Sequence, residues 1–319
     1  MVRILIALGG NAIKQAHEKG TKEEQMHNCD VTARQIAKII KDDPTREIVI
    51  THGNGPQSGN LALQQDIAKA QIPAQPLDIV GAMTQGQIGY MFQNRLQAAF
   101  KAEGIDRQVI CLVNQVLVSR DDPEFVGENA SKPVGNFLSK EEAETLKKEK
   151  GWIVKNVKPS AEKGWRRVVP SPNPLRNVEA ETAKILVNSG VVVIASGGGG
   201  IPVVETPEGY EGVEAVIDKD LAGACLADSV SADIFMILTD IDAACVNFGK
   251  PNQEKLIGEV KYPKMEEYVK EGHFSAGSMG PKVGACMRHV EKTKKRAIIA
   301  SLEEAVDALA GKKGTHIVF

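Results

Sequence analysis

Glycine-rich turns after apolar runs are the first feature of this sequence that suggests chemistry. Three such stretches read LGGN (8–11), THGNGPQSG (51–59) and SGGGGIP (196–202). Each follows a short run of Ile, Val, Leu or Ala that is typical of a buried strand. Glycine leaves backbone N–H groups open to an anion, and ligands bind outside the carboxyl edge of open parallel sheets. The three turns together therefore predict an anion or phosphate site.

Two lysines stand where helices are expected to begin. Lys219 lies between Asp218 and Asp220 in the stretch EAVIDKDLAGACLAD (214–228), and Lys282 lies just inside a helix that should begin near Met279. A lysine in the first turn of a helix opposes the helix dipole unless an anion compensates it. We therefore expect both ammonium groups to face a phosphate. Asp218 is equally well interpreted as a helix N-cap.

The common phosphate-binding motifs are missing from the sequence. G-x-x-x-x-G-K-[ST] does not occur, because GSMGPKV (277–283) carries its lysine in a different frame. The pattern G-x-G-x-x-G, started at Gly53, has Ser58 at its last glycine position. The H-R-D and D-F-G motifs of protein kinases are also absent. These observations exclude P-loop NTPases, standard Rossmann dehydrogenases and protein kinases.

The elements that must position these residues alternate between strands and helices. Continuous apolar runs, typical of strands covered on both faces, occupy 4–8, 47–51, 109–118, 191–196, 235–239 and 297–301. Helices are expected after the capping box of Thr21 and Glu24, over 78–103 with a stop at Gly104, and after a second capping box of Ser301 and Glu304. This alternation predicts a three-layer αβα sandwich with a mostly parallel sheet.

Residues 120–168 break this alternation. The segment is polar and rich in Pro and Gly, with one charged helix, SKEEAETLKKEK (139–150). We interpret it as an excursion from the sheet, and insertions of this length in compact enzymes are often lids.

Composition narrows the class of protein further. Of 319 residues, 42% are hydrophobic and 4% aromatic, and the formal net charge is −2. These values argue against a nucleic-acid partner, and no apolar stretch is long enough to span a membrane. The N-terminal MVRILIALGG is expected to be a strand rather than a signal peptide. Five scattered cysteines without zinc spacing predict free thiols and a cytoplasmic protein.

The motifs taken together resemble the carbamate kinases of the amino acid kinase family. IALGGNA, THGNGPQ, GAMTQGQIGYM, RRVVPSP, SGGGGIPV, AVIDKDLA, ILTDIDA and SMGPKV occur in order over nearly the whole chain. The resemblance implies an open αβα sandwich around a twisted sheet of about eight strands, with a protruding subdomain at 120–168. It also implies an acceptor half at 1–205, a nucleotide half at 206–319 and a homodimer.

The resemblance assigns site residues by position. Lys219 and Lys282 match the lysines that bridge the transferring phosphoryl group, Asp220 the aspartate that holds them, and Lys132 a lysine of the protruding subdomain. Lys132 lies in a stretch less regular than the family's Asn-Pro-Thr-Lys-Pro pattern. The phosphate-contacting positions are Gly9, Gly10, Asn11, Gly53, Asn54, Gly55, Gly197, Gly198, Gly199 and Gly200. The nucleotide-binding positions are Thr239, Asp240, Val246, Gly277, Ser278, Met279 and Gly280. An aromatic residue often found near this pocket is absent here, where Cys245 stands.

The implied reaction is reversible phosphoryl transfer between carbamoyl phosphate and ADP, which gives ATP and carbamate. Carbamate is already an anion and needs no general base, and His52 is better interpreted as a structural hydrogen-bonding residue. Mg²⁺ is expected to bind with the nucleotide rather than in a protein cage. Two alternatives stay open: a family member with another acceptor, such as UMP or an acetylated amino acid, and a non-catalytic nucleotide sensor. The first is disfavoured because Ala7 stands where those relatives carry a lysine.

Overall fold

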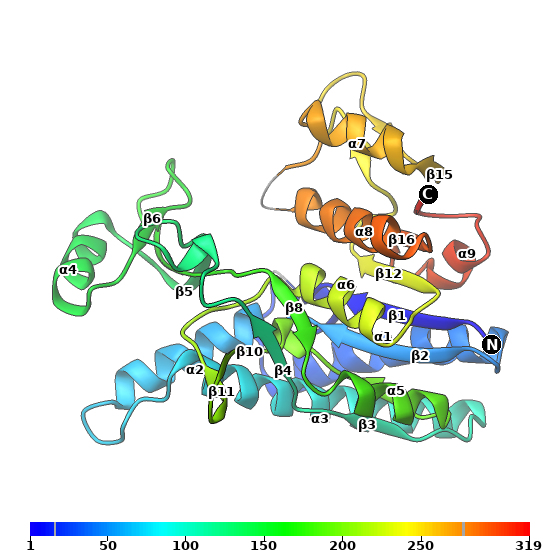
Figure 1. Cartoon of the computed structure of the whole chain (residues 1–319), viewed down its shortest axis with the longest axis horizontal. Coiled ribbons are helices and arrows are strands. Elements are labelled where there is room, and N and C mark those ends of the chain that lie inside the picture. Colours follow the sequence, from blue (N-terminus) through cyan, green and yellow to red (C-terminus); the bar gives the residue numbers. More distant parts are fainter. Residues whose placement is uncertain (16, 276–277) are drawn as a thin grey trace.

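An eight-stranded sheet forms the centre of the computed structural model, which describes residues 1–15, 17–275 and 278–319 (Figure 1). In spatial order its strands are β15 (Gly258–Lys261), β17 (Thr315–Val318), β16 (Arg296–Ser301), β12 (Ile234–Thr239), β1 (Arg3–Leu8), β2 (Glu47–His52), β9 (Val192–Ile194) and β3 (Val109–Cys111). Neighbouring strands are parallel except β16 and β17. The predicted mostly parallel sheet is confirmed.

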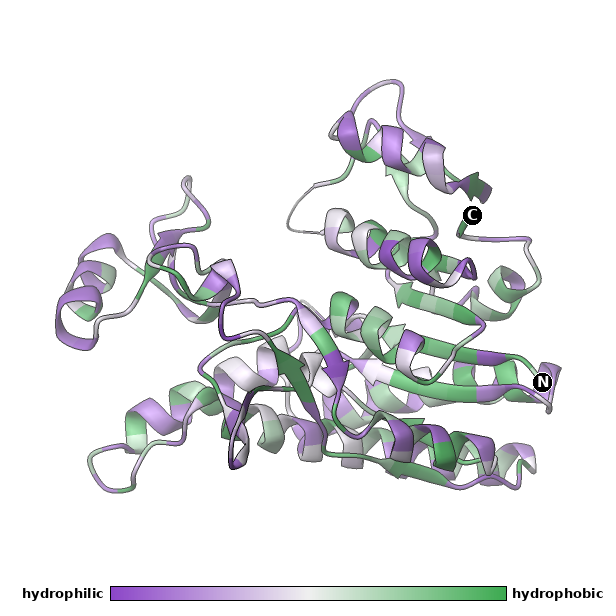
Figure 2. Ribbon diagram, in the orientation of Figure 1, coloured by the Kyte–Doolittle hydropathy of each residue, from purple (hydrophilic) through white to green (hydrophobic). Residues whose placement is uncertain are grey.

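Helices cover both faces of this sheet. The helices of the described residues are α1 (Lys22–Asp42), α2 (Gly55–Ala68), α3 (Leu77–Glu103), α4 (Lys140–Lys150), α5 (Ala180–Asn188), α6 (Lys219–Ser229), α7 (Tyr262–Lys270), α8 (Met279–Thr293) and α9 (Ala305–Leu309), of which α4 lies away from the sheet. In β1, Ile4 and Ile6 join the apolar cluster formed with α1, α3 and α9, whereas Leu5 joins the cluster with α5, α6 and α8. Successive side chains of a strand point to opposite faces, so β1 is apolar and buried on both faces from Ile4 to Leu8, and Figure 2 shows mainly hydrophobic residues in the central strands.

Of the three helix ends predicted from capping boxes or a terminal glycine, two are confirmed. The Thr21 side chain accepts from the Glu24 N–H and Glu24 reciprocates, which forms the predicted capping box of α1. Gly104 ends α3 in the left-handed conformation, with φ of 67°. The capping box at Ser301 is wrong, because Ser301 is the last residue of β16 and α9 begins only at Ala305. The Ser301 hydroxyl donates to the Glu304 carboxylate at 3.3 Å instead of capping the helix.

The apolar run 109–118 is two strands rather than one. β3 belongs to the large sheet, whereas β4 (Gln115–Val118) belongs to a second sheet with β8 (Pro174–Asn177), β10 (Ile201–Thr206) and β11 (Gly209–Gly212). The break lies at Asn114, which is buried. Its N–H donates to Gln85 at 2.9 Å, and its Oδ1 accepts from the Ser196 N–H at 2.6 Å. These bonds replace the ladder of a continuous strand.

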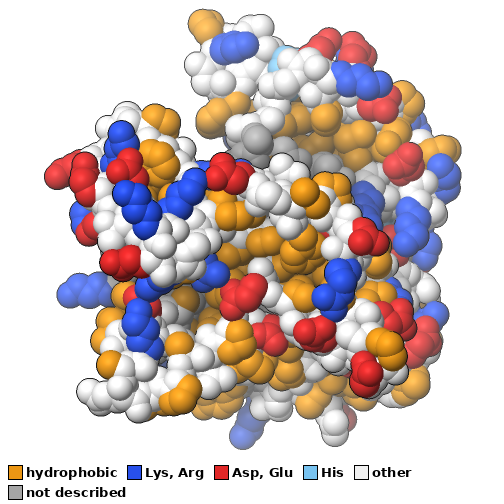
Figure 3. Space-filling model, turned by 60° about the vertical axis from the view of Figure 1, so that its left-hand side comes forward, with side chains coloured by type: hydrophobic (Ala, Val, Ile, Leu, Met, Phe, Trp, Pro, Cys, Tyr) orange, Lys and Arg blue, Asp and Glu red, His pale blue; other side chains and the backbone are white. Residues whose placement is uncertain are grey.

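The expected excursion is a separate subdomain. β5 (Lys132–Leu138), β6 (Val154–Asn156) and β7 (Trp165–Val169) form an antiparallel sheet, with α4 packed beside it. Figure 1 shows it projecting at the left of the main body, and Figure 3 shows acidic and basic side chains interspersed over it. A further pair, β13 (Cys245–Val246) and β14 (Glu254–Lys255), completes the strands among the described residues.

The predicted division between residues 205 and 206 falls inside β10. The large sheet crosses between the two proposed halves, because β1 pairs with β12. The division into an acceptor half and a nucleotide half therefore stays a prediction about ligands. Among the described residues, no helix is long and apolar enough to cross a bilayer, and all five cysteines are free thiols.

Candidate active site

The first two glycine turns meet at one edge of the sheet. Gly9 follows β1 and Gly53 follows β2, and these strands pair in parallel register from Arg3 with Glu47 to Leu8 with His52. Beyond them lies a cavity of about 700 Å³. The predicted residues that line it are Gly9, Gly10, Asn11, Gly53, Asn54, Gly55, Gly198, Lys132, Lys219, Asp220, Lys282, Thr239, Asp240 and Ser278.

The glycines of the third turn mainly allow close packing of neighbouring residues. The structure describes all four glycines of this turn, and Gly198 alone lines the cavity. A Cβ on Gly198, whose φ is +68°, would lie 2.1 Å from Asn54 Nδ2, and one on Gly199, with φ of +103°, would lie 2.4 Å from the Ile217 carbonyl oxygen. No other residue type fits such positions. Phosphate contact by Gly197, Gly199 and Gly200 stays a prediction.

The two predicted lysines converge on one carboxylate. Lys219 is the first residue of α6 and Lys282 lies in the first turn of α8. Lys219 Nζ donates to Asp220 Oδ1 at 2.6 Å, and Lys282 Nζ donates to Asp220 Oδ2 at 3.1 Å. The Asp220 side chain is 4% exposed, and the lysine side chains are 20% and 16% exposed. We call Lys219, Asp220 and Lys282 the clamp. Its carboxylate is almost shielded from solvent, whereas its two ammonium groups border the cavity.

Burial and charge act against each other in this clamp. Desolvation lowers the pKa of Lys219, an effect that Asp220 opposes and the neighbouring Lys282 reinforces. Desolvation also raises the pKa of Asp220, but the two ammonium groups outweigh it and hold that pKa below its ordinary value. Asp220 is therefore ionised at neutral pH and supports the charge of its partners.

Gly53 packs closely against the stem of Lys219. A Cβ at this position would lie 3.1 Å from Cδ of Lys219, tighter than an ordinary contact. A larger residue would therefore need the lysine stem to shift by a few tenths of an ångström. The second glycine turn thus has a packing reason as well as an anion-binding one.

The protruding subdomain contributes a third lysine. Lys132, at the start of β5, lines the cavity, and its Nζ donates to Asp218 Oδ2 at 2.8 Å. The other oxygen of Asp218 accepts from the N–H groups of Asp220 and Leu221, so the N-cap interpretation is confirmed. Sequence reasoning did not foresee that Asp218 has both roles.

Arg166 of β7 also lines the cavity and was missed. Its guanidinium donates to the Gly135 carbonyl at 2.7 and 3.1 Å, and burial lowers its pKa. The sequence feature that could have predicted it is the Arg-Arg pair of GWRRVV. Because adjacent side chains of a strand point to opposite faces, one of these two arginines could face the site. Of the charged lining residues that the structure describes, four are basic and three acidic, which favours an anionic ligand.

The predicted nucleotide residues divide into two groups. Thr239, Asp240 and Ser278 line the cavity, and Asn11 Nδ2 donates to Asp240 Oδ2 at 2.8 Å. The side chains of Val246 and Met279 are buried in the apolar core, and a Cβ on Gly280 would lie 2.8 Å from the Ser275 carbonyl oxygen. Nucleotide contact by these three residues stays a prediction. Gly277 lies outside the described residues.

His52 is a structural residue in this geometry. It is fully buried, and desolvation lowers its pKa to about 4, so the ring is neutral at pH 7. Its Nδ1 lies 3.0 Å from the Gly53 carbonyl oxygen, and it does not belong to the described lining of the cavity. Within residues 1–15, 17–275 and 278–319, no group of three or more His, Cys, Asp or Glu residues is arranged to hold a metal ion.

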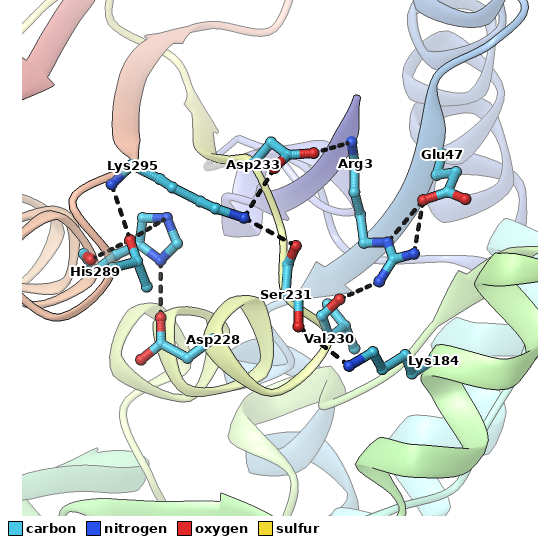
Figure 4. Close-up of polar contacts among 10 residues, drawn as sticks. Arg3, Glu47, Lys184, Asp228, Val230, Ser231, Asp233, His289 and Lys295 are labelled. Carbon is cyan, nitrogen blue, oxygen red and sulfur yellow. Dashed lines mark hydrogen bonds and ion pairs between the residues drawn. The ribbon is translucent and has the colours of Figure 1, made fainter. Parts of the chain in front are cut away.

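A second ionic cluster joins the same two helices at their other ends. Asp228 of α6 lies 2.9 Å from His289 Nδ1 of α8, and Lys292 Nζ lies 3.2 Å from its other oxygen. Figure 4 shows Asp228 and His289 pointing toward each other, near the contacts of Lys295 with Asp233 and Ser231. α6 and α8 are therefore fixed to each other at both ends.

Comparison with known proteins shows which proteins this chain is similar to. The amino acid kinase family matches residues 2–301. A carbamate kinase of Thermococcus kodakarensis is 55% identical over 320 residues, which covers 100% of this chain and 99% of that protein. A carbamate kinase of Pyrococcus furiosus is 53% identical and covers 99% of both chains. The solved structure of carbamate kinase from Giardia lamblia bound to AMP-PNP has a TM-score of 0.92 and 44% identity, over 99% of this chain and 98% of that one.

Proposed function

This chain belongs to the amino acid kinase family, and we propose from that premise that it acts as a carbamate kinase. The reaction is reversible transfer of a phosphoryl group between carbamoyl phosphate and ADP, which gives ATP and carbamate; carbamate then decomposes to ammonia and bicarbonate. Sequence identity of 53–55% over the full length to proteins named carbamate kinase supports this acceptor over the others in the family.

The observation that carries the proposal is the clamp formed by Lys219, Asp220 and Lys282 beside the glycine turns. Phosphoryl transfer needs charge stabilisation and in-line positioning more than covalent chemistry. The transferring group carries negative charge on its equatorial oxygens. An ammonium about 4 Å from such an oxygen contributes roughly 4 kcal/mol at an effective dielectric near 20. Two ammonium groups on one carboxylate can act on that charge from two directions.

The backbone of the glycine turns complements the lysines. Gly10 and Gly55 have nothing within 4 Å of an added Cβ, which leaves their backbone accessible from the cavity. Gly55 is also the first residue of α2, where helix N–H groups and the dipole favour an anion. No histidine belongs to the described lining of the cavity, and its three carboxylates already accept hydrogen bonds: Asp218 from Lys132, Asp220 from Lys219 and Lys282, and Asp240 from Asn11. This arrangement fits carbamate, an acceptor that is already ionised and needs no general base.

Nucleotide is proposed to occupy the part of the cavity near Thr239, Asp240 and Ser278. Mg²⁺ would arrive on its phosphates and supply additional positive charge there. The phosphates of the nucleotide, rather than a cage of side chains, would be its main ligands. The protein's own residues then hold the phosphoryl group and its acceptor in line.

A homodimer in the cytoplasm is also proposed. Ile79, Met83 and Tyr90 are spaced to lie on one face of α3 and are exposed. An exposed apolar surface of this kind is typical of a subunit interface. Light scattering of the purified protein should give twice the chain mass of 34.3 kDa.

The test is direct turnover. Purified protein is mixed with Mg-ADP and carbamoyl phosphate, and ATP is followed with a coupled hexokinase assay. ATP formation at catalytic rates supports the proposal. UMP and N-acetylglutamate, each offered with ATP, test other acceptors, and turnover with one of them but not with carbamoyl phosphate would replace it. Tight nucleotide binding without turnover would favour a sensor.

A further inference from the structure

The carboxylate of Asp218 connects two separate parts of the molecule. Its Oδ1 accepts from the N–H groups of Asp220 at 2.9 Å and Leu221 at 3.3 Å, and so fixes the first turn of α6. Its Oδ2 accepts from Nζ of Lys132 at 2.8 Å. Lys132 belongs to the protruding subdomain, 86 residues earlier in the chain.

The environment of this ion pair makes it stronger than an ordinary surface pair. The side chain of Asp218 is 18% exposed and that of Lys132 is 32% exposed. Partial desolvation strengthens the attraction between the charges, and the capped helix end holds the carboxylate in place before the lysine arrives. Asp218 also lines the cavity, two residues before Asp220.

We propose that Asp218 is a positioning residue, which holds the ammonium of Lys132 at a fixed place beside the clamp of Lys219, Asp220 and Lys282. This inference rests on the proposed phosphoryl-transfer function. Three ammonium groups would repel one another across the cavity, and Asp218 supplies the second carboxylate that offsets this repulsion. An ammonium has three donors, so Lys132 can keep its bond to Asp218 and still donate to a phosphoryl oxygen.

Ionic links from β7 and from α4 of the protruding subdomain to the main body provide matched controls. Arg167 Nη2 lies 3.3 Å from Glu214 Oε2, and Lys150 Nζ lies 2.8 Å from Asp66 Oδ1. Glu214 also accepts from the N–H of Leu77 at 3.1 Å, at the start of α3. Glu214→Gln therefore weakens attachment of the subdomain without altering the carboxylate that caps α6.

The first experiment separates the charge of Asp218 from its cap. Asn is as good an N-cap as Asp, so Asp218→Asn keeps the start of α6 and removes only the ion pair. We expect kcat/KM for carbamoyl phosphate to fall about tenfold with little change in Tm, whereas Glu214→Gln stays within about twofold of the wild type. Wild-type kinetics for Asp218→Asn, or an equal loss in Glu214→Gln, would overturn the inference.

A double-mutant cycle then tests whether Asp218 acts through Lys132. If it does, Asp218→Asn combined with Lys132→Met should be no slower than Lys132→Met alone, because the lysine that Asp218 positions is already gone. Multiplying losses in the double variant would show independent roles and contradict the inference. If Asp218 only stabilised the fold, Tm would fall in all three variants, and the effects of the two substitutions on rate would not be coupled in this way.

A measurement that needs no activity distinguishes this inference from the proposed function. Lys132 is acetylated with a water-soluble N-hydroxysuccinimide ester, and its labelling rate is read by mass spectrometry. Asp218→Asn should raise that rate at least about threefold, because the amine loses the carboxylate that holds it in place at 2.8 Å, and Glu214→Gln should not. Unchanged labelling would overturn the inference even in an active enzyme. An inactive wild type with the expected labelling would overturn only the function.

Discussion

The two ends of the α6–α8 pair carry almost the same ionic arrangement. At one end, Asp220 of α6 binds Lys219 and Lys282, and at the other end, Asp228 of α6 binds His289 and Lys292. In each case one carboxylate accepts from two basic side chains. The first cluster borders a cavity of about 700 Å³, whereas the second does not belong to its described lining.

The difference lies in what surrounds each carboxylate. Asp220 stands at helix N-termini, where the dipole favours an anion and the glycine turns leave backbone open. Asp228 stands in the last turn of α6, and its partner His289 is fully buried with its ring 5.7 Å from that of Phe235. An ionic cluster therefore becomes a candidate ligand site where backbone and cavity admit a ligand, and a structural link where packing closes around it.

The largest effect is expected from loss of the Lys282 ammonium, which faces the cavity. Lys282→Ala should lower kcat by at least about 10²-fold, as loss of a transition-state donor does in other enzymes. The fold should survive, since Asp220 keeps Lys219 as its partner. The coupled ATP assay measures this, with Tm as the control for folding. A kcat within threefold of the wild type would remove Lys282 from the mechanism.

Removing the shared carboxylate should change the pH dependence. Asp220 opposes the desolvation that lowers the pKa of Lys219, so Asp220→Asn should lower that pKa further. The charged lysine is then lost at lower pH, and the basic limb of the kcat profile should move to lower pH. At pH 7 we expect a loss between about 10- and 100-fold. A basic limb that does not move, measured between pH 6 and 10, would contradict this role.

The opposite end of the helix pair should respond in stability and not in rate. His289→Leu removes one partner of a buried carboxylate, a change that costs about 3 kcal/mol in other buried pairs. We expect a fall of several degrees in Tm and a kcat within about threefold of the wild type. Calorimetry and the ATP assay on the same preparation decide this. A large fall in kcat with unchanged Tm would mean that this end also serves catalysis.

The smallest effect is expected at Lys292, the counterpart of Lys282. Its side chain is 63% exposed, and exposed ion pairs contribute at most about 1 kcal/mol. Lys292→Ala should leave kcat unchanged and Tm within about two degrees. Comparing it with Lys282→Ala tests whether surroundings, rather than the lysine–aspartate pair itself, decide function.

Local sequence patterns predicted much of the fold. Apolar runs marked the strands that carry the glycine turns, Thr21 marked the start of α1, and Gly104 marked the end of α3. They failed where a tertiary contact overrode a local pattern. The run 109–118 is broken by Asn114, whose partners Gln85 and Ser196 lie elsewhere in the chain.

The sequence alone determined which residues are able to do chemistry here. Glycine at positions 9, 10, 53 and 55, and lysine at the starts of α6 and α8, follow from residue type and from spacing along a strand or helix. Those are local properties, because backbone freedom and helix dipoles depend on a few neighbouring residues.

Only the tertiary structure decided which of those residues meet. Lys282 reaches Asp220 across 62 residues, and Lys132 reaches Asp218 across 86. It also decided that Gly199 packs against Ile217 and that Asp228 is buried against His289. Such pairings depend on the order of the strands and on how the helices pack over them. They are set by burial of the whole apolar core, which no short stretch of sequence contains.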